Sequence, residues 1–394
     1  MWRRVLLAAL VAALVASLAC YIAFRRSTKR GVFDSIARIP YSSLLSNDPS
    51  IRKDLFQSMR EFGIFFVQDI PSYNASSELL HLKHFFALPL PIKMEHAVRK
   101  HNGNNINVYR GYGPLSVNQG TQFKETFNIG PHEVHPAYND SGSALERMRS
   151  VGKERNVWPR TGEPEFDERF KELFTSGFAL RRSIALATIR TVCRHLKFPH
   201  LIDLFTHHEF STLGLRKYPL RTSINKGTLS SHDDVLLTEL EHVDSTVTVL
   251  STFNNTGLQA LYKGQYWDVP VSGDGFLINI GTLVEDMTDG EIISVRHRVI
   301  QIDKVRYSIP FFFNPSFDAD ISRSMSGKLT KAGEKYRTFG EWMSDYLPRV
   351  EPGLLKPAPS QPSQQMVEDQ GQLETDQAEL DDAKSGTLAR LTLN

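Results

Sequence analysis

The sequence has too few cysteines for a disulfide framework. It contains only Cys20 and Cys193. Cys20 lies in an apolar N-terminal segment, so Cys193 has no partner in the rest of the chain. A small domain stabilised by disulfides is therefore excluded, and a reducing compartment is favoured.

The chain also lacks an excess of charge of either sign. Its 46 Lys and Arg residues are balanced by 44 Asp and Glu residues, and no basic stripe recurs with aromatic residues. This balance argues against a nucleic-acid partner. The length of 394 residues and the hydrophobic content of 41% indicate a globular chain with one large domain or two small ones.

Long hydrophobic runs are missing apart from one at the N-terminus, Val5 to Phe24. A helix of about twenty residues, at about 1.5 Å each, can cross a bilayer core of about 30 Å. Because the run continues past Ser17-Leu18-Ala19, a possible cleavage site, we expect a single-pass anchor rather than a cleaved signal peptide. More positive charges follow the run than precede it, which predicts that the domain after the run is cytoplasmic. These charges are Arg3 and Arg4 before the run, and Arg25, Arg26, Lys29 and Arg30 after it.

The C-terminal tail, residues 351–394, has no aromatic residue and is rich in Gln, Pro, Asp and Glu. This composition predicts disorder, and a solvated extension is favoured over a partner-binding segment. A last helix is expected from Thr338 to Leu347. The proposed divisions are 1–30 for the anchor and its basic flank, 36–160 for an N-terminal region, 161–210 for buttress helices, 211–320 for the core domain and 321–350 for a C-terminal helix.

Helical periodicity marks the N-terminal half of the chain. Leu55, Met59 and Phe62 share one helix face before Gly63, where the strand Ile64 to Val67 begins. A second helix is expected from Ser77 to Phe86. The long amphipathic pattern from Phe166 to Arg194 predicts a helix that supports a sheet from behind.

Short strands separated by Gly, Asn and Asp turns alternate from Leu213 to Phe313. This pattern is typical of a double-sheet jelly roll, with the clearest turns at Lys263-Gly264 and Ser272 to Gly275. The polar residues 116–155 are expected to form loops over the site. The predicted fold is mostly β with flanking α, a jelly-roll core (double-stranded β-helix) and a helical N-terminal region.

A candidate metal site begins with His242 and Asp244. They lie two residues apart at the head of an alternating run that extends to Val249. On a single strand, residues i and i+2 point to the same face, so the imidazole and the carboxylate would converge on the side of Thr246 and Thr248.

A second imidazole, His297, lies in another strand-like run, Val295 to Ile302. Two His and one carboxylate bind one face of an octahedral metal and leave the opposite positions open, as in non-haem Fe(II) oxygenases. A rival His-x-Asp occurs at His232-Asp233-Asp234. It lies in a polar stretch without strand alternation, and we interpret it as a loop that covers the site.

Arg306 and Ser308 share a strand face beyond His297 and form a fork for a carboxylate. Arg306 could instead be a surface ion-pair partner. Its position before the apolar run Ile309 to Phe313 favours a specific role. Arg298, next to His297, should face the other way and is interpreted as structural.

These motifs resemble the isopenicillin N synthase-like branch of the Fe(II)/2-oxoglutarate-dependent dioxygenases, which carries His-x-Asp, a later His and Arg-x-Ser. The resemblance covers roughly residues 36 to 320. Further segments match in the order of the family: Ile39-Pro40, Glu61 to Val67, Phe85 to Lys93, Arg110 to Leu115, Phe123 to Gly130, Asn156 to Pro159 and Leu215 to Pro219.

The resemblance implies that His242, Asp244 and His297 hold Fe(II), and that Arg306 and Ser308 hold the far carboxylate of 2-oxoglutarate. Tyr218 would be a second contact to this co-substrate. Arg216 departs from the pattern, because plant members often have Asn there. The implied partners are molecular oxygen, ascorbate as a reductant and a small, lipophilic substrate suggested by the anchor.

The implied reaction is oxidation of a small organic molecule with release of succinate and CO2. Hydroxylation is the default, although relatives also desaturate or close rings. Two alternatives stay open from the sequence. One is an oxidase of the same fold that does not use 2-oxoglutarate, and the other is a catalytically silent, membrane-tethered binding protein.

Overall fold

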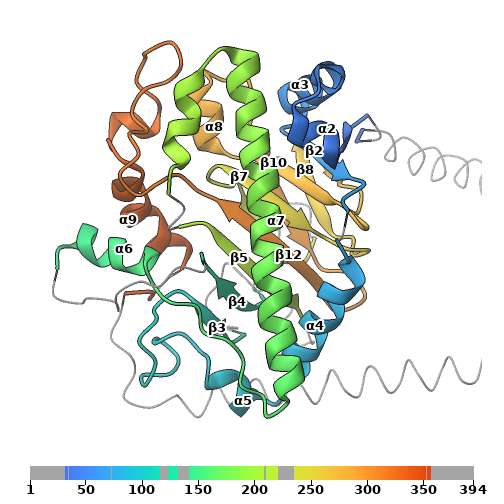
Figure 1. Cartoon of the computed structure of the whole chain (residues 1–394), viewed down its shortest axis with the longest axis vertical. Helices are drawn as coiled ribbons and strands as arrows, with labels where there is room; N and C mark the ends of the chain where they lie inside the picture. The colour runs from blue at the N-terminus through green and yellow to red at the C-terminus, as the bar shows by residue number, and fades with distance from the viewer. Residues whose placement is uncertain are drawn as a thin grey trace, which may run out of the picture.

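A computed structural model describes residues 32, 33, 35–71, 73–115, 123–131, 142–207, 210–220, 235–351 and 353–355. Two β-sheets form its centre, and a long helix crosses one of them (Figure 1). The apolar residues of both sheets and of the surrounding helices belong to one large core. The predicted jelly roll with a helical N-terminal region is confirmed.

The larger sheet has eight strands in the order β1-β2-β10-β7-β12-β5-β4-β3. Except for the parallel pair β1 and β2, neighbouring strands run antiparallel. The strands are β1 (Arg38–Pro40), β2 (Ile64–Gln68), β3 (Gly111–Gly113), β4 (Glu125–Ile129), β5 (Thr212–Tyr218), β7 (Val247–Ser251), β10 (Phe276–Ile280) and β12 (Arg306–Phe313).

The smaller sheet has the order β6-β11-β8-β9, with β6 (Leu237–His242), β11 (His297–Ile300), β8 (Leu258–Tyr262) and β9 (Gln265–Asp268). The hairpin between β8 and β9 turns at Lys263 and Gly264, whose φ angles are 49° and 78°. Two successive positive φ angles are those of a type I′ turn, so this predicted turn is confirmed.

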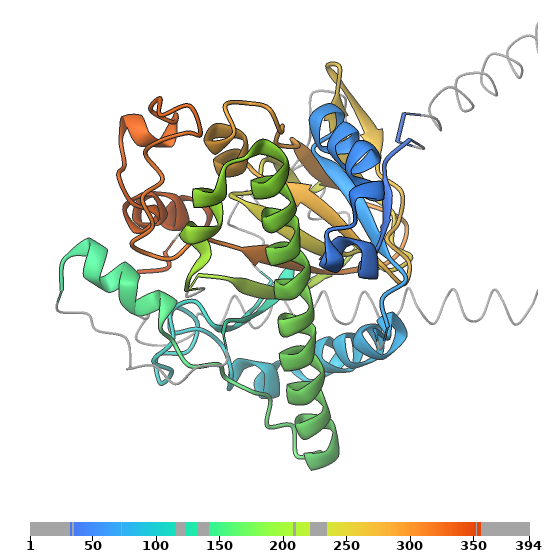
Figure 2. The same ribbon diagram turned by 45° about the horizontal axis from the view of Figure 1, so that its top comes forward.

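The long helix α7 (Pro164–Leu196) has 33 residues and lies over the larger sheet (Figures 1 and 2). Its Phe178 ring packs edge-on against Phe311 of β12, with centroids 4.9 Å apart. A second link is polar, because the buried Arg181 guanidinium donates to the Ser251 hydroxyl of β7 at 2.6 Å. The helix therefore supports the sheet from behind, as its pattern predicts.

The N-terminal helices pack beside β2. Leu55 and Met59 of α3 (Arg52–Glu61) are fully buried, and the helix ends just before Gly63, which has a φ of 69°. A Cβ at Gly63 would lie 2.6 Å from the backbone oxygen of Ile293, so only glycine fits this close approach. The other helices of the N-terminal region are α2 (Tyr41–Ser46), η1 (Pro49–Ile51), α4 (Ala75–Ala87) and α5 (Leu90–Met94).

The C-terminal helix α9 (Phe339–Val350) begins with a capping box between Thr338 and Glu341, which confirms the predicted last helix. It packs against α6 (Ala144–Gly152) in a second core that includes Met148 and Phe339. The remaining short helices are η2 (Pro199–Phe205), α8 (Thr282–Met287) and η4 (Ala332–Glu334).

The prediction of loops throughout residues 116–155 is wrong for two parts of that stretch. Strand β4 occupies Glu125–Ile129, and its polar residues are buried because they pair with charged side chains of other strands. Helix α6 begins at a capping box between Ser143 and Glu146, a signal that the sequence contains. Residues 116–122 and 132–141 lie outside the described part of the chain.

The expected anchor at residues 5–24, the C-terminal tail beyond residue 355 and the rival His232-Asp233-Asp234 all lie outside the described residues. Among the helices that the structure describes, none is both long enough and apolar enough to cross a membrane.

Candidate metal centre and adjoining cavities

The three candidate ligands meet where the two sheets come together. His242 ends β6 and His297 begins β11, and the two residues are direct partners in the smaller sheet. Asp244 follows β6 in the turn that leads to β7 of the larger sheet. The expectation that one strand continues from His242 to Val249 is wrong. The chain crosses between sheets at residues 243–246, and this crossing turns the carboxylate toward the imidazoles.

The geometry of the three side chains suits a single metal ion. The Nε2 atoms of His242 and His297 each lie 3.9 Å from Oδ1 of Asp244. One ligand atom from each residue lies within 4.8 Å of the others. Asp244 and His297 are 5% and 7% exposed, whereas the His242 side chain is 35% exposed. The cluster is thus buried on one side and open on the other.

Hydrogen bonds orient both imidazoles for metal binding. Nδ1 of His242 donates to the Leu240 carbonyl at 2.8 Å, and Nδ1 of His297 donates to the Val295 carbonyl at 3.1 Å. A carbonyl can only accept, so Nδ1 carries the proton and Nε2 keeps its lone pair. Burial, with the adjacent His242, lowers the pKa of His297, which favours the neutral form that a ligand needs.

The donor set fits Fe(II). Imidazole nitrogen and carboxylate oxygen are ligands that this ion accepts, and three ligands on one side leave positions for other molecules. Asn279 of β10 donates to Oδ2 of Asp244 at 3.4 Å and leaves Oδ1 facing the imidazoles. Oδ1 of Asn279 is buried without a hydrogen-bond partner, an unmet acceptor beside the cluster.

Arg306 and Ser308 lie beside the metal centre on β12. They are 2% and 1% exposed, and Nη1 of Arg306 donates to the Ser308 hydroxyl at 3.2 Å. The Arg306 guanidinium lies 4.9 Å from the ring centroid of Tyr218. All three line a narrow cavity of about 40 Å³ that His242, Asp244 and His297 also line. The structure therefore brings all six predicted site residues together around one space.

Arg298 faces away from this cavity, as expected. Its Nε donates to Oε1 of Gln259 at 2.9 Å, and its guanidinium lies 3.9 Å from the Tyr266 ring centroid. It supports the smaller sheet.

The chain matches two family models. Residues 36–160 match the N-terminal domain of non-haem dioxygenases in morphine synthesis, and residues 215–315 match the 2OG-Fe(II) oxygenase superfamily. The 2-oxoglutarate-Fe(II) type oxidoreductase hxnY of Emericella nidulans is 30% identical over 307 residues, which cover 71% of this chain and 79% of that protein. The chain belongs to the 2OG-Fe(II) oxygenase superfamily.

Two further comparisons agree. Isopenicillin N synthase of Flavobacterium is 27% identical over 295 residues, which cover 72% of this chain and 86% of that enzyme. The crystal structure of a full-length Neurospora crassa protein in complex with alpha-KG has a TM-score of 0.59 at 21% identity. That match covers 80% of this chain and 96% of the Neurospora protein, and it shows the shared fold. The protein described here is a non-haem iron dioxygenase with Fe(II) and 2-oxoglutarate as its cofactors.

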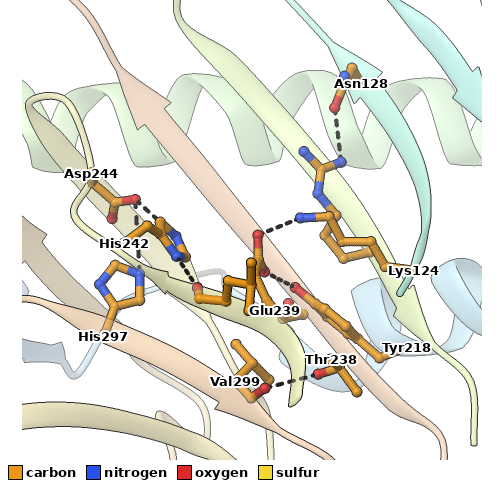
Figure 3. A network of polar contacts seen from close by, with 12 residues as sticks. Lys124, Asn128, Tyr218, Thr238, Glu239, His242, Asp244, His297 and Val299 are labelled. Atoms are coloured by element: carbon orange, nitrogen blue, oxygen red, sulfur yellow. Dashed lines mark hydrogen bonds and ion pairs between the residues drawn. The ribbon is translucent and has the colours of Figure 1, made fainter. Parts of the chain in front are cut away.

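Sequence reasoning missed Glu239, a partly buried carboxylate beside the metal centre of this oxygenase (Figure 3). Its Oε1 accepts from Lys124 Nζ at 2.6 Å, and its Oε2 accepts from the Tyr218 hydroxyl at 3.0 Å. Burial alone would raise its pKa, but the Lys124 ammonium holds the pKa of Glu239 well below its usual range. The carboxylate is thus ionised and fixes Tyr218. Lys124 lies in the matched segment FKETFNIG, which was the available signal.

A larger cavity of about 280 Å³ adjoins the metal centre. His242 and Asp244 line it, and α9 covers part of it. Much of its wall is apolar, from Phe210, Leu240, Phe312, Met343, Leu347 and Val350. A space of this kind beside the ligands suits a small organic molecule.

Proposed function

We propose that this oxygenase hydroxylates a small organic molecule held in the larger cavity, with release of succinate and CO2. In this proposal His242, Asp244 and His297 bind Fe(II). The supporting observation is that metal ligands border two adjoining cavities, a narrow one lined by the buried Arg306 guanidinium and a larger, mostly apolar one that His242 and Asp244 line. Each cavity therefore offers a place beside the metal ligands, one for the co-substrate and one for the substrate.

Arg306 and Ser308 would hold the carboxylate of 2-oxoglutarate that is distant from the metal. A buried guanidinium with a neighbouring hydroxyl offers charge-assisted hydrogen bonds to a carboxylate. Tyr218 lines the same cavity but already donates to Glu239, so we propose that it acts as a wall and a second contact. The narrow cavity favours a small dicarboxylate over a bulky substrate, which supports 2-oxoglutarate use over the oxidase alternative.

When bound, Fe(II) and 2-oxoglutarate supply oxidising power by coupling cleavage of O2 to decarboxylation. For hydroxylation the balance is substrate C–H plus O2 plus 2-oxoglutarate, giving substrate C–OH, succinate and CO2. The chain's own part is to hold the imidazoles with Nε2 free, fix the carboxylate and keep the narrow cavity dry. The apolar wall positions the substrate bond next to the metal.

The test is succinate release by the chain lacking residues 1–30, with Fe(II), ascorbate, oxygen and 2-oxoglutarate. Arg306→Ala removes hydrogen bonds to a charged group, each worth about 1.5–3 kcal/mol, so the KM for 2-oxoglutarate should rise about tenfold to a hundredfold. His242→Ala should abolish succinate release, because it removes a metal ligand.

Arg60→Ala, at an exposed ion pair with Glu291, is the matched control and should leave both parameters unchanged. An unchanged KM in Arg306→Ala would remove Arg306 from the co-substrate site. If the wild type binds metal but neither binds 2-oxoglutarate nor releases succinate, the proposal fails and the oxidase alternative replaces it.

Membrane attachment through residues 5–24 with a cytoplasmic catalytic domain is a separate proposal that only the sequence supports. Retention of the full chain, and release of the chain lacking residues 1–30, in an alkaline membrane extraction would test it.

A further inference from the structure

One buried cation of the larger cavity lacks a counter-ion in the described part of the chain. Arg216 of β5 is 5% exposed and lines both cavities. Its Nη1 donates to Oδ1 of Asn128 at 2.8 Å and to the Leu215 carbonyl at 3.1 Å. Both acceptors are neutral, and no described carboxylate forms an ion pair with this guanidinium.

The nearby Glu239 does not complete the pairing. Its two oxygens accept from Lys124 and from the Tyr218 hydroxyl. Among the described residues, no hydrogen bond or ion pair joins Arg216 to Glu239. Lys124 and Arg216 together therefore face a single negative charge.

The other charged residues of the cavity wall have partners of their own. The ion pairs are Arg349 with Asp345, Glu351 with Lys100, and Glu241 with Arg296. Asp244 is left for the metal. Among the described residues, the wall of the larger cavity therefore has one positive charge, that of Arg216, without a negative partner.

The Arg216 guanidinium also has hydrogen-bond donors that are available to a ligand. Nε and Nη2 of Arg216 make no hydrogen bond with the described residues. These two atoms are also not fully buried. Both nitrogen atoms are therefore accessible to a ligand in the cavities that Arg216 lines. A Cβ at Gly214 would lie 2.5 Å from Nη2, so this glycine makes room for the guanidinium.

An uncompensated buried charge destabilises a fold, and a bound ligand of opposite charge removes that destabilisation. A carboxylate matches the planar fork of Arg and can accept two parallel hydrogen bonds. The rest of the wall is largely apolar, including Phe210, Phe312, Met343 and Leu347. The missing partner is thus an anionic group attached to an apolar body.

We infer that the substrate is a small apolar organic acid whose carboxylate is bound by Arg216. This inference rests on the proposed function, because it names the class of molecule that is oxidised in the larger cavity. Arg216 is the partner of Ser308 across β5 and β12, so the competing possibility is that it binds 2-oxoglutarate instead.

The experiment compares acids with their neutral amides on the full chain, loaded with Fe(II) and 2-oxoglutarate without oxygen. The probes are 4-phenylbutyrate and decanoate, each beside its primary amide, and binding is measured by calorimetry. At least one acid should bind about tenfold or more tightly than its amide, as expected for a charge-assisted hydrogen bond. Arg216→Gln should abolish that preference and leave amide binding unchanged.

Two further variants sharpen the result. Gly214→Ala keeps the charge but displaces the guanidinium, so it should weaken acid binding without changing the charge of the cavity. Arg60→Gln removes an equal charge from an exposed site and should change nothing. Arg216→Gln should fold at least as stably as the wild type, because it removes an uncompensated buried charge.

Three results would overturn the inference. The first is that neither acid binds more tightly than its amide. The second is that Arg216→Gln keeps the preference for the acid. The third is that Arg216→Gln raises the KM for 2-oxoglutarate, measured as succinate release without an oxidisable substrate. Failure of the proposed function looks different. In that case acid binding depends on Arg216 but the wild type forms no succinate.

Discussion

Removal of one partner of the buried ion pair between Arg181 of α7 and Glu78 of α4 should greatly lower the free energy of unfolding. Nη1 and Nη2 of Arg181 donate to the two carboxylate oxygens of Glu78 at 2.8 and 2.6 Å. The side chains are 0% and 2% exposed. Nη2 also donates to Ser251 of β7, so this pair joins two helices to the larger sheet.

The Glu78→Ala substitution would leave the Arg181 charge buried among apolar groups, with the Phe276 ring centroid 4.6 Å from its guanidinium. Removing one partner of such a pair costs about 3–5 kcal/mol. The whole free energy of unfolding of a typical domain is about 5–15 kcal/mol. With an m-value of about 3 kcal/mol/M, the midpoint of urea unfolding should fall by about 1 M or more.

Urea unfolding followed by circular dichroism measures this loss, with Glu291→Ala at the exposed pair with Arg60 as the control. The control should cost less than about 1 kcal/mol. The double variant Glu78→Leu with Arg181→Met should recover much of the stability, because it removes both charges. A loss below about 1 kcal/mol in Glu78→Ala would refute the assignment of this pair as buried and dry.

Two further predictions concern buried titratable groups. Burial raises the pKa of Cys193 to about 11. In a Cys20→Ser variant at pH 8, iodoacetamide should therefore modify Cys193 only after the protein unfolds. Equal modification rates with and without denaturant would contradict this. Burial and the adjacent Lys100 lower the pKa of His101 to about 3, against about 6.5 when unfolded. The folded protein therefore binds fewer protons in this range, and stability falls as the pH drops from about 6.5 toward 3. His101→Gln should reduce the difference between the urea midpoints at pH 7 and pH 5, and an unchanged difference would exclude this contribution.

The metal ligands could be predicted from the sequence because two of them lie at the ends of short, strongly patterned strands. His297 begins β11, and His242 ends β6. The local conformation of Asp244 could not be predicted in this way. The valines and threonines after it alternate, but both parities are buried because β7 lies between α7 and the interior of the sandwich. Alternation therefore suggested one continuous strand where the chain in fact changes sheets.

The charge network between the cavities was beyond sequence reasoning for a different reason. Lys124 and Glu239 are 115 positions apart. They meet because the segment before β4 lies beside β6, where the Phe123 N–H donates to the Thr238 carbonyl at 2.9 Å. Neither residue has a spacing rule of its own. The matched segment around Lys124 indicated a family feature, but it did not indicate the partner.

Adjacent residues of β5 offer an internal comparison for the charge of the larger cavity. Lys217 points to the opposite face from Arg216, and its Nζ lies 2.8 Å from Oε1 of Glu125. That carboxylate also accepts from Lys93 and from the Tyr112 hydroxyl, so Lys217 and Lys93 each lie within ion-pair distance of a carboxylate. If Arg216 contributed only to stability, we would expect it to have a carboxylate partner as well. Arg216, one residue away and also buried, has only neutral acceptors in the described structure, which is the pattern expected if its counter-ion arrives with the substrate.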